Sequence, residues 1–214
     1  MVMGALVTSP EVVDLQFALQ GRSVPFDYAD PLWDALREVL PWLVDEALAG
    51  VHPLYGLSPG RGEWYLSRRS QLSLRLPLER IAAAQALTGA SLNLADATVE
   101  VGKATEKAVP HTPVLYSRFV TFDGDQADLP DEGRFFAACQ AGLAELALSP
   151  HSVVCGRRQT TRTAQGTLHG FSLMVMGLNE AATQRLLAHG LGVERKRGCG
   201  IFMPHKSNPS DGAL

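Results

Sequence analysis

Hydrophobic and polar residues alternate in the first patterned stretch of the chain. Val13, Leu15, Phe17 and Leu19 are apolar, and polar residues stand between most of them before Gly21. A period of two residues is typical of a strand that buries one face. We therefore predict a half-buried strand over residues 12–21.

A helical period follows and completes a recognisable unit. Asp30 and Pro31 open a helix that we expect to run to about Gly50, with one apolar face that repeats at helical spacing. That face consists of Leu32, Leu36, Val39, Leu40 and Leu43. The pattern then predicts strands over 63–66 and 72–76, a short helix over 78–87 and a strand over 92–101. The order of these elements is βαββαβ.

The same order of elements repeats in the second half. Strands are predicted over 114–122, 152–158 and 168–175, and a last apolar run covers 201–203. One helix is marked by Phe135, Cys139, Leu143 and Leu146, and Asn179 caps another that runs to about His189. Two βαββαβ units predict an α+β protein with two tandem ferredoxin-like, RRM-like domains. The stretch 103–112 lacks periodicity, so we place the domains at 1–105 and 106–214.

A glycine-rich loop precedes the last apolar run. It reads Gly-Leu-Gly-Val-Glu-Arg-Lys-Arg-Gly-Cys-Gly over residues 190–200, and its basic insert is Arg195, Lys196 and Arg197. Glycines allow positive φ angles and close backbone approach, and open N–H groups in such a loop favour anions. With three cations at the same place, the loop predicts a partner rich in phosphate. A plain turn between a helix and a strand is the alternative.

Charge is distributed unevenly along the chain. The net charge is −3, but residues 1–148 hold 11 basic and 19 acidic residues, whereas residues 149–206 hold 8 basic and 2 acidic ones. A local field steers a charged partner more than the total charge does, so the second half can carry a basic face. Two solvated surfaces with a chance imbalance would give the same numbers.

The glycine loop and several other segments resemble a known family. The wording His-Gly-Leu-Gly-Val-Glu-Arg-Lys-Arg-Gly-Cys-Gly-Ile-Phe is similar to the C-terminal loop of the CRISPR-associated RAMP superfamily, above all of its repeat-processing endoribonucleases. The strand over 12–21, Val-His-Pro-Leu after the first helix and the segment 72–80 are similar to one compact branch of these nucleases. The resemblance covers most of the chain. It implies a metal-independent endoribonuclease that cleaves CRISPR repeat RNA by 2′-hydroxyl attack, leaves a 2′,3′-cyclic phosphate and keeps the guide RNA bound.

His52 is the candidate for proton transfer. It follows the first helix in a loop, and the resemblance implies a general acid or base histidine in this region. Histidine can exchange protons near neutral pH. Tyr55 and Arg61 lie in the same segment and complete the predicted catalytic set. A surface histidine without a role is the alternative.

Other residues are predicted to bind RNA. A cluster of arginines interleaved with threonines could follow an RNA backbone, although an ordinary exposed hairpin would have the same residues. A second cluster beside His52 could stabilise charge on phosphorus. The predicted RNA-binding set is Arg68, Arg69, Arg157, Arg158, Arg162, Gly190, Gly192, Arg195, Lys196, Arg197, Gly198 and Gly200.

Composition limits the remaining classes. No apolar run approaches the length of a membrane span, and the six histidines show no metal-ligand spacing, so we predict no membrane, metal or cofactor. Three widely spaced cysteines fit a reducing cytoplasm. We expect CRISPR repeat RNA, guide RNA and subunits of an effector complex as partners. A non-catalytic RNA-binding subunit and a metabolic or protein-binding module of the same fold stay open as alternatives.

Overall fold

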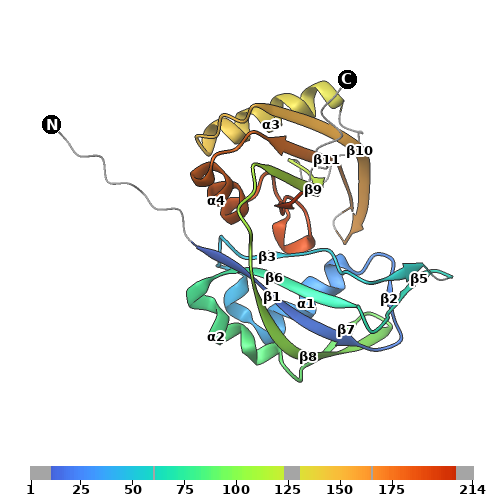
Figure 1. Ribbon diagram of the computed structural model, residues 1–214. Helices are drawn as coiled ribbons and strands as arrows, with labels where there is room; N and C mark the ends of the chain where they lie inside the picture. The colour runs from blue at the N-terminus through green and yellow to red at the C-terminus, as the bar shows by residue number, and fades with distance from the viewer. Residues whose placement is uncertain (1–10, 60, 123–130, 165, 206–214) are drawn as a thin grey trace.

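The computed structural model describes residues 11–59, 61–122, 131–164 and 166–205. Within these residues the chain forms two domains, each built on an antiparallel sheet with helices packed against it (Figure 1). We call the part through β8 the N-terminal domain and the part from β9 the C-terminal domain. No helix among the described residues is both long and apolar enough to cross a membrane.

The N-terminal domain has a sheet of five strands and a small sheet of three. The large sheet has the order β3-β6-β1-β8-β7, in which the first four strands show the order of a ferredoxin-like unit. The strands of this sheet are β1 (Val12–Gln20), β3 (Gly50–Val51), β6 (Gln71–Pro77), β7 (Ser91–Leu94) and β8 (Ala97–Ala108). The small sheet contains β2 (Ser23–Pro25), β5 (Glu63–Tyr65) and β4 (Ser58–Pro59). The α-helices are α1 (Ala29–Val39) and the short α2 (Ile81–Ala84).

The C-terminal domain repeats the arrangement with four strands in the order β10-β11-β9-β12. Its elements are β9 (Val114–Val120), α3 (Glu132–Glu145), β10 (Ser152–Thr163), β11 (Gly166–Met176), α4 (Glu180–His189) and β12 (Met203–Pro204). Asn179 caps α4, because its Oδ1 accepts a hydrogen bond from the N–H of Ala182 at 2.8 Å. The predicted α+β fold with two tandem ferredoxin-like domains is thus confirmed.

Three local predictions were wrong. The first helix ends at Val39 and not near Gly50, because Pro41 forces the preceding residue out of the helical region (φ −124°, ψ 72° at Leu40). The second strand of the N-terminal unit is β3, and the predicted strand over 63–66 lies in the small sheet as β5. The predicted strand over 92–101 is a hairpin of β7 and β8, which turns at Ala95 with a φ of +58°.

Alternation along β1 assigns different tasks to the two faces of the large sheet. Leu15 and Phe17 are fully buried against the helical side, where they pack with Leu36 of α1. Asp14 points to the opposite face, toward the C-terminal domain, and stands opposite Arg75 of β6 in the register. A strand of the N-terminal domain therefore places polar groups where the two domains meet. The last strand of this domain, β8, continues to Ala108, beyond the predicted boundary at 105.

Candidate active site and nucleic-acid interface

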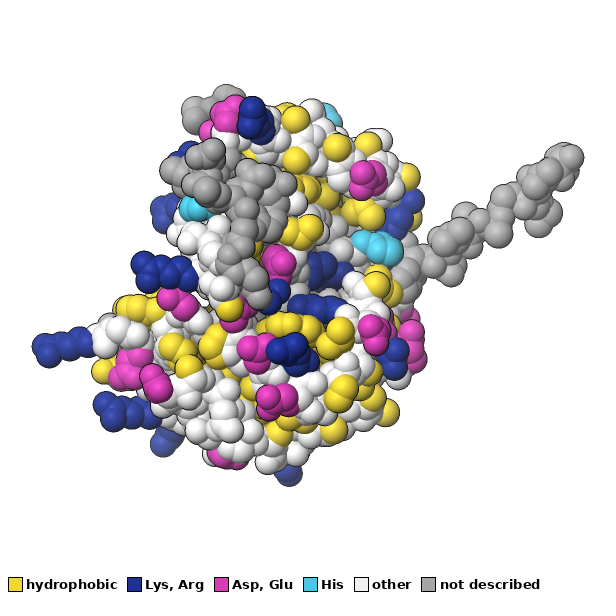
Figure 2. Space-filling view, turned by 180° about the vertical axis from the view of Figure 1, so that it is seen from behind, with side chains coloured by type: hydrophobic (Ala, Val, Ile, Leu, Met, Phe, Trp, Pro, Cys, Tyr) yellow, Lys and Arg dark blue, Asp and Glu magenta, His cyan; other side chains and the backbone are white. Residues whose placement is uncertain are grey.

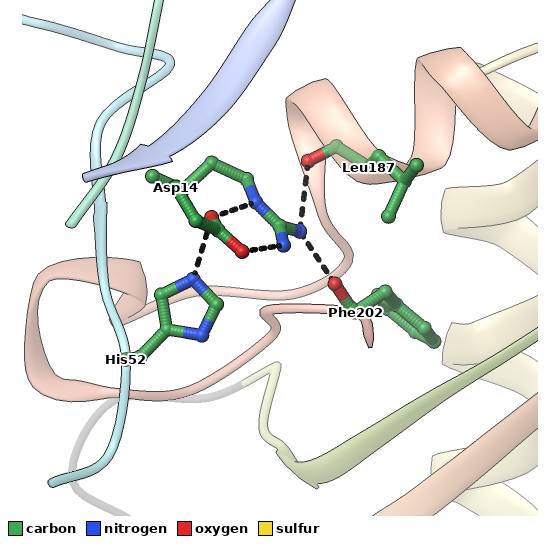
Figure 3. A network of polar contacts seen from close by, with 5 residues as sticks. Asp14, His52, Leu187 and Phe202 are labelled. Atoms are coloured by element: carbon green, nitrogen blue, oxygen red, sulfur yellow. Dashed lines mark hydrogen bonds and ion pairs between the residues drawn. The ribbon is translucent and has the colours of Figure 1, made fainter. Parts of the chain in front are cut away.

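His52 lies at the junction of the two domains, directly after β3. Its ring is only 6% exposed, and its Nε2 lies 3.0 Å from Oδ1 of Asp14 (Figure 3). The second ring nitrogen points away from this carboxylate in the same view. The histidine that the sequence singled out is therefore oriented by a carboxylate from the neighbouring strand.

Arg75 joins the same network and links it to the C-terminal domain. Its guanidinium is fully buried and binds Asp14 through two bonds, Nε to Oδ1 at 2.8 Å and Nη2 to Oδ2 at 2.9 Å. Its Nη1 donates to the carbonyl oxygens of Phe202 at 2.5 Å and Leu187 at 3.4 Å. Figure 3 shows these bonds crossing from the sheet to the C-terminal domain. The network satisfies a buried arginine and holds the domains together.

The surroundings determine the protonation state of the pair. Burial raises the pKa of Asp14, but the hydrogen bond and charge of His52 and the charge of Arg75 outweigh it and hold the pKa well below its usual range. Burial lowers the pKa of His52, although Asp14 opposes this shift. At neutral pH the carboxylate is thus ionised and the imidazole is neutral. Since an ionised carboxylate only accepts hydrogen bonds, the proton of His52 lies on Nε2 and the lone pair on Nδ1.

A cleft of about 460 Å³ opens beside this network, between the two domains. Pro53 and Leu54, which follow His52 in the chain, form part of its lining. The remaining lining residues are Phe26, Tyr28, Ala29, Tyr55, Gly56, Leu57, Trp64, Arg118, Phe119, Gln159, Thr160, Thr161, Arg197 and Gly198. Aromatic rings from the N-terminal domain therefore face polar and cationic side chains from β9 and β10 of the C-terminal domain.

The other predicted catalytic residues occupy different places. Tyr55 is 68% exposed and lines the cleft, and its backbone N–H and C=O pair with Gln71 at the edge of β6. Arg61 is exposed between β4 and β5 and is not among the residues that line the cleft. Arg68 and Arg69 are exposed in the turn before β6. The structure therefore brings Tyr55, but not Arg61, to the cleft next to His52.

The arginines of the β10–β11 hairpin, Arg157, Arg158 and Arg162, are all exposed. We call them the hairpin arginines. Figure 2 shows Lys and Arg side chains that project along the left edge of the molecule, among some Asp and Glu side chains. The same edge is at the right of Figure 1, where β5 and β10 lie. Beyond the hairpin arginines, the backbone N–H of Ala164 donates to Asp30 of the N-terminal domain, so the hairpin end is held in place.

The glycine loop, residues 190–200, is folded against the protein itself. All four of its glycines have positive φ angles between +65° and +87°, as the sequence predicted. The expectation of open N–H groups was wrong for seven positions, because their N–H groups donate to protein carbonyl oxygens. These positions are Gly190, Leu191, Val193, Arg197, Gly198, Cys199 and Gly200. Their backbone groups stabilise the loop and its contact with β9 and are not free to bind an anion.

The three cations of the loop contact the N-terminal domain. Arg197 pairs with Asp30 and with Glu194, and Lys196 donates to the carbonyl oxygen of Val44 at 2.5 Å. Arg195 is largely buried, and its Nε and Nη2 have no hydrogen-bond partner within the described part of the chain. Burial and, secondarily, the nearby Arg75 lower its pKa to about 10. Their role as phosphate ligands stays a prediction.

Sequence reasoning missed Asp14, Arg75 and Arg118. Asp14 and Arg75 stand directly opposite each other on the paired strands β1 and β6, and each lies between two buried apolar residues of its strand. Two opposite charges at such positions are a signal of a buried ion pair that could have been recognised. Arg118 stands on β9 and is exposed into the cleft, but no pattern in the sequence distinguishes it from a solvated strand residue.

Metal ligands are not gathered at this site. Within residues 11–59, 61–122, 131–164 and 166–205, no group of three or more His, Cys, Asp or Glu side chains is placed to hold a metal ion. In the network described above, Asp14 and His52 bind each other, and Asp14 also binds Arg75. The chemistry that these residues themselves can supply is proton transfer and anion binding.

The site thus lies where two ferredoxin-like domains meet, with a polar junction and a cleft between them. The family model described as "Cas6 Crispr" matches residues 13–207. A protein of Myxococcus xanthus (strain DK1622), "CRISPR-associated endonuclease Cas6", is 35% identical over 192 residues, which cover 90% of this chain and 81% of that protein. The chain therefore belongs to the Cas6 family of CRISPR-associated proteins, and the predicted resemblance to repeat-processing RAMP proteins is confirmed.

Solved structures show the same fold at low sequence identity. A "CRISPR associated protein Cas6" has a TM-score of 0.66 and 13% identity, with 92% of this chain and all of that chain covered. An "RAMP protein binding different RNA substrates" has a TM-score of 0.63 and 13% identity, over 89% and 98% of the two chains. The product of a Cas6-related gene from Pyrococcus furiosus has a TM-score of 0.60 and 15% identity, over 89% and 97%. These likenesses establish the fold and not the site.

Proposed function

We propose that this protein is an endoribonuclease that cleaves the repeat RNA of CRISPR precursor transcripts into guide RNAs. Membership of the Cas6 family and the name of the Myxococcus relative support this activity. The observation that carries the mechanism is the Asp14–His52 pair, with a bond of 3.0 Å between the two side chains, in which His52 directly precedes the cleft-lining Pro53 and Leu54.

His52 is the proposed general base. The lone pair on its Nδ1 takes the proton of the 2′-hydroxyl, and Asp14 stabilises the imidazolium that forms. The 2′ oxygen then bonds to the adjacent phosphorus, the bond from phosphorus to the 5′ oxygen breaks, and a 2′,3′-cyclic phosphate remains. The 5′ oxygen takes a proton from the hydroxyl of Tyr55, which is exposed in the cleft. The step needs no metal ion.

The proposed contacts to RNA follow from exposure. The hairpin arginines and Arg61, Arg68 and Arg69 are all exposed, and arginine binds phosphate through two parallel hydrogen bonds. One of these arginines would stabilise the charge that develops on phosphorus. Arg195, Lys196 and Arg197 would have to exchange contacts with the N-terminal domain for contacts with phosphate. We therefore assign the first contacts to the exposed arginines and the positioning of the cleft to the glycine loop.

The product is proposed to stay bound and to bring the protein into an effector complex. Phosphate contacts spread over both domains would persist after cleavage, because the chemistry changes one phosphodiester and leaves the others in place. A cytoplasmic location stays a prediction from the cysteine pattern.

One observation favours a second candidate, a non-catalytic RNA-binding subunit. His52 is 6% exposed in the free protein, so RNA can reach only the edge of its ring that faces away from Asp14. In this alternative the Asp14–His52–Arg75 network holds the domains together, and the protein binds the repeat without cleaving it.

Cleavage of a repeat transcript in excess chelator separates the two candidates. The transcript of the CRISPR array from the same genome is incubated with the protein in EDTA, and both new ends are mapped. The proposal expects one cut within each repeat, a 5′-hydroxyl on one side and a 2′,3′-cyclic phosphate on the other. Binding of the repeat without cleavage would favour the non-catalytic subunit. If cleavage still requires a divalent ion when the repeat RNA has already been folded, the mechanism is contradicted.

A further inference from the structure

The cleft between the domains has two chemically different walls. Phe26 and Trp64 belong to the wall from the N-terminal domain, and their rings meet edge to face with centroids 5.0 Å apart. The wall from the C-terminal domain includes Arg118, Gln159 and Thr160. One wall therefore offers aromatic faces, and the other offers hydrogen-bond donors and acceptors.

Phe26 is unusual because a large apolar ring is left 43% exposed inside the cleft. Its contact with Trp64 holds the ring at the cleft wall. Unstacked bases of single-stranded RNA bind on such aromatic faces, and their edges bind polar side chains. An exposed ring opposite Arg118 and Gln159 therefore matches the two surfaces of a base.

The size of the cleft restricts its occupant. Its volume of about 460 Å³ lies in the range of sites for small molecules, roughly 300–1,000 Å³, and is suited to one nucleotide. A paired base has its hydrogen-bonding edge occupied by its partner, so the polar wall could not bind that edge in a duplex. On the wall from the N-terminal domain, the hydroxyl of Tyr28 accepts a hydrogen bond from the Leu54 N–H at 2.9 Å and keeps its own proton for a further acceptor.

We propose that the cleft binds one unpaired nucleotide of the RNA, with its base on Phe26 and Trp64 and its edge facing Arg118, Gln159 and Thr160. This inference rests on the proposed function, because the repeat must cross the cleft to place a nucleotide there. Pro53 and Leu54 follow His52 directly and line the cleft, so the bound nucleotide lies next to the phosphodiester that is cut. The pocket would thus help to select the cleavage position by recognising a base that is not in a stem.

The test uses repeat RNA with a 2′-deoxy residue at the mapped cut, so that binding is measured without cleavage. Abasic nucleotides are introduced one position at a time, and affinities are measured for the wild-type protein, Phe26→Leu and Phe26→Tyr. Stacking of one base contributes roughly a 5- to 150-fold gain in affinity. We expect one position close to the cut at which the abasic RNA loses this affinity with the wild type and with Phe26→Tyr, but not with Phe26→Leu.

Tyr65→Ala is the matched control. Tyr65 neighbours Trp64 in β5 and is 37% exposed, but it does not line the cleft. Its substitution should leave the profile of abasic penalties unchanged. If Phe26→Leu lowers affinity equally at all positions, or leaves every penalty as in the wild type, the inference is overturned while cleavage of the repeat stands. If the wild-type protein neither binds nor cleaves the repeat, the proposed function fails and the inference fails with it.

Discussion

Arg75→Met is the substitution that tests the junction of the domains most severely. Methionine keeps much of the volume of the arginine side chain but removes its charge and all of its donors. Asp14 would then be left without its bidentate partner, and the carbonyl oxygens of Leu187 and Phe202 would lose their donor. His52 alone would remain to bind the carboxylate.

The size of the effect follows from burial. Arg75 is fully buried and Asp14 is largely buried, and removing one partner of a buried ion pair costs about 3–5 kcal/mol. That loss is a large part of the free energy of unfolding of an ordinary domain, about 5–15 kcal/mol. At about 3 kcal/mol per molar urea, the midpoint would fall by roughly 1–2 M.

Urea unfolding can be followed by two signals that report on different parts of the chain. The three tryptophans, Trp33, Trp42 and Trp64, all lie in the N-terminal domain, whereas circular dichroism reports on both domains. Arg37→Met is the control, because Arg37 pairs with Asp34 at the surface and both side chains are more than half exposed. A loss of less than about 1 kcal/mol in Arg75→Met, similar to that of the control, would refute the assignment of Arg75 as the link between the domains.

Three further predictions concern the site and the loop. Burial lowers the pKa of His52 below 6.5, so on acidification the unfolded chain binds a proton at this imidazole before the folded protein does. The free energy of unfolding should therefore fall as the pH drops below about 6.5. In His52→Ala the urea midpoint should depend less on pH between about 5 and 6.5. Replacing the three hairpin arginines by alanine should reduce the slope of log K against log salt for repeat RNA by up to about 2–3, and an unchanged slope would place the RNA elsewhere. Gly192→Ala should destabilise the protein more than Gly89→Ala. Both glycines have a φ above +80°, but a Cβ at 192 would overlap the Thr121 carbonyl oxygen, whereas at 89 nothing lies within 4 Å. Equal losses of unfolding free energy would contradict this account.

The periodicity of the chain was sufficient to predict the fold, because two βαββαβ units leave few arrangements of strands. The errors lie where tertiary contacts override local pattern. The two-residue strand β3 is too short to show a period, and it forms because Gly50 and Val51 pair with β6. The end of α1 could have been predicted from Pro41.

The candidate site was only partly predictable. His52 and Tyr55 are close in sequence, but their side chains face the junction and the cleft respectively, and this difference depends on the partner strand. The cations of the glycine loop were predicted to bind phosphate because they stand together between closely spaced glycines. The contacts of Arg197 with Asp30 and of Lys196 with Val44 follow from the docking of the two domains, which no local pattern encodes.

The single-turnover cleavage rate of His52→Ala tests the central claim most directly. Enzyme is kept in excess over the cognate repeat in EDTA, and affinity is measured in parallel with RNA that carries a 2′-deoxy residue at the cut. His151→Ala, in an exposed turn before β10, serves as the control. The account predicts a rate roughly 10²–10⁴-fold lower for His52→Ala with little change in affinity, and a wild-type rate for the control. Cleavage by folded His52→Ala at the wild-type rate would contradict it.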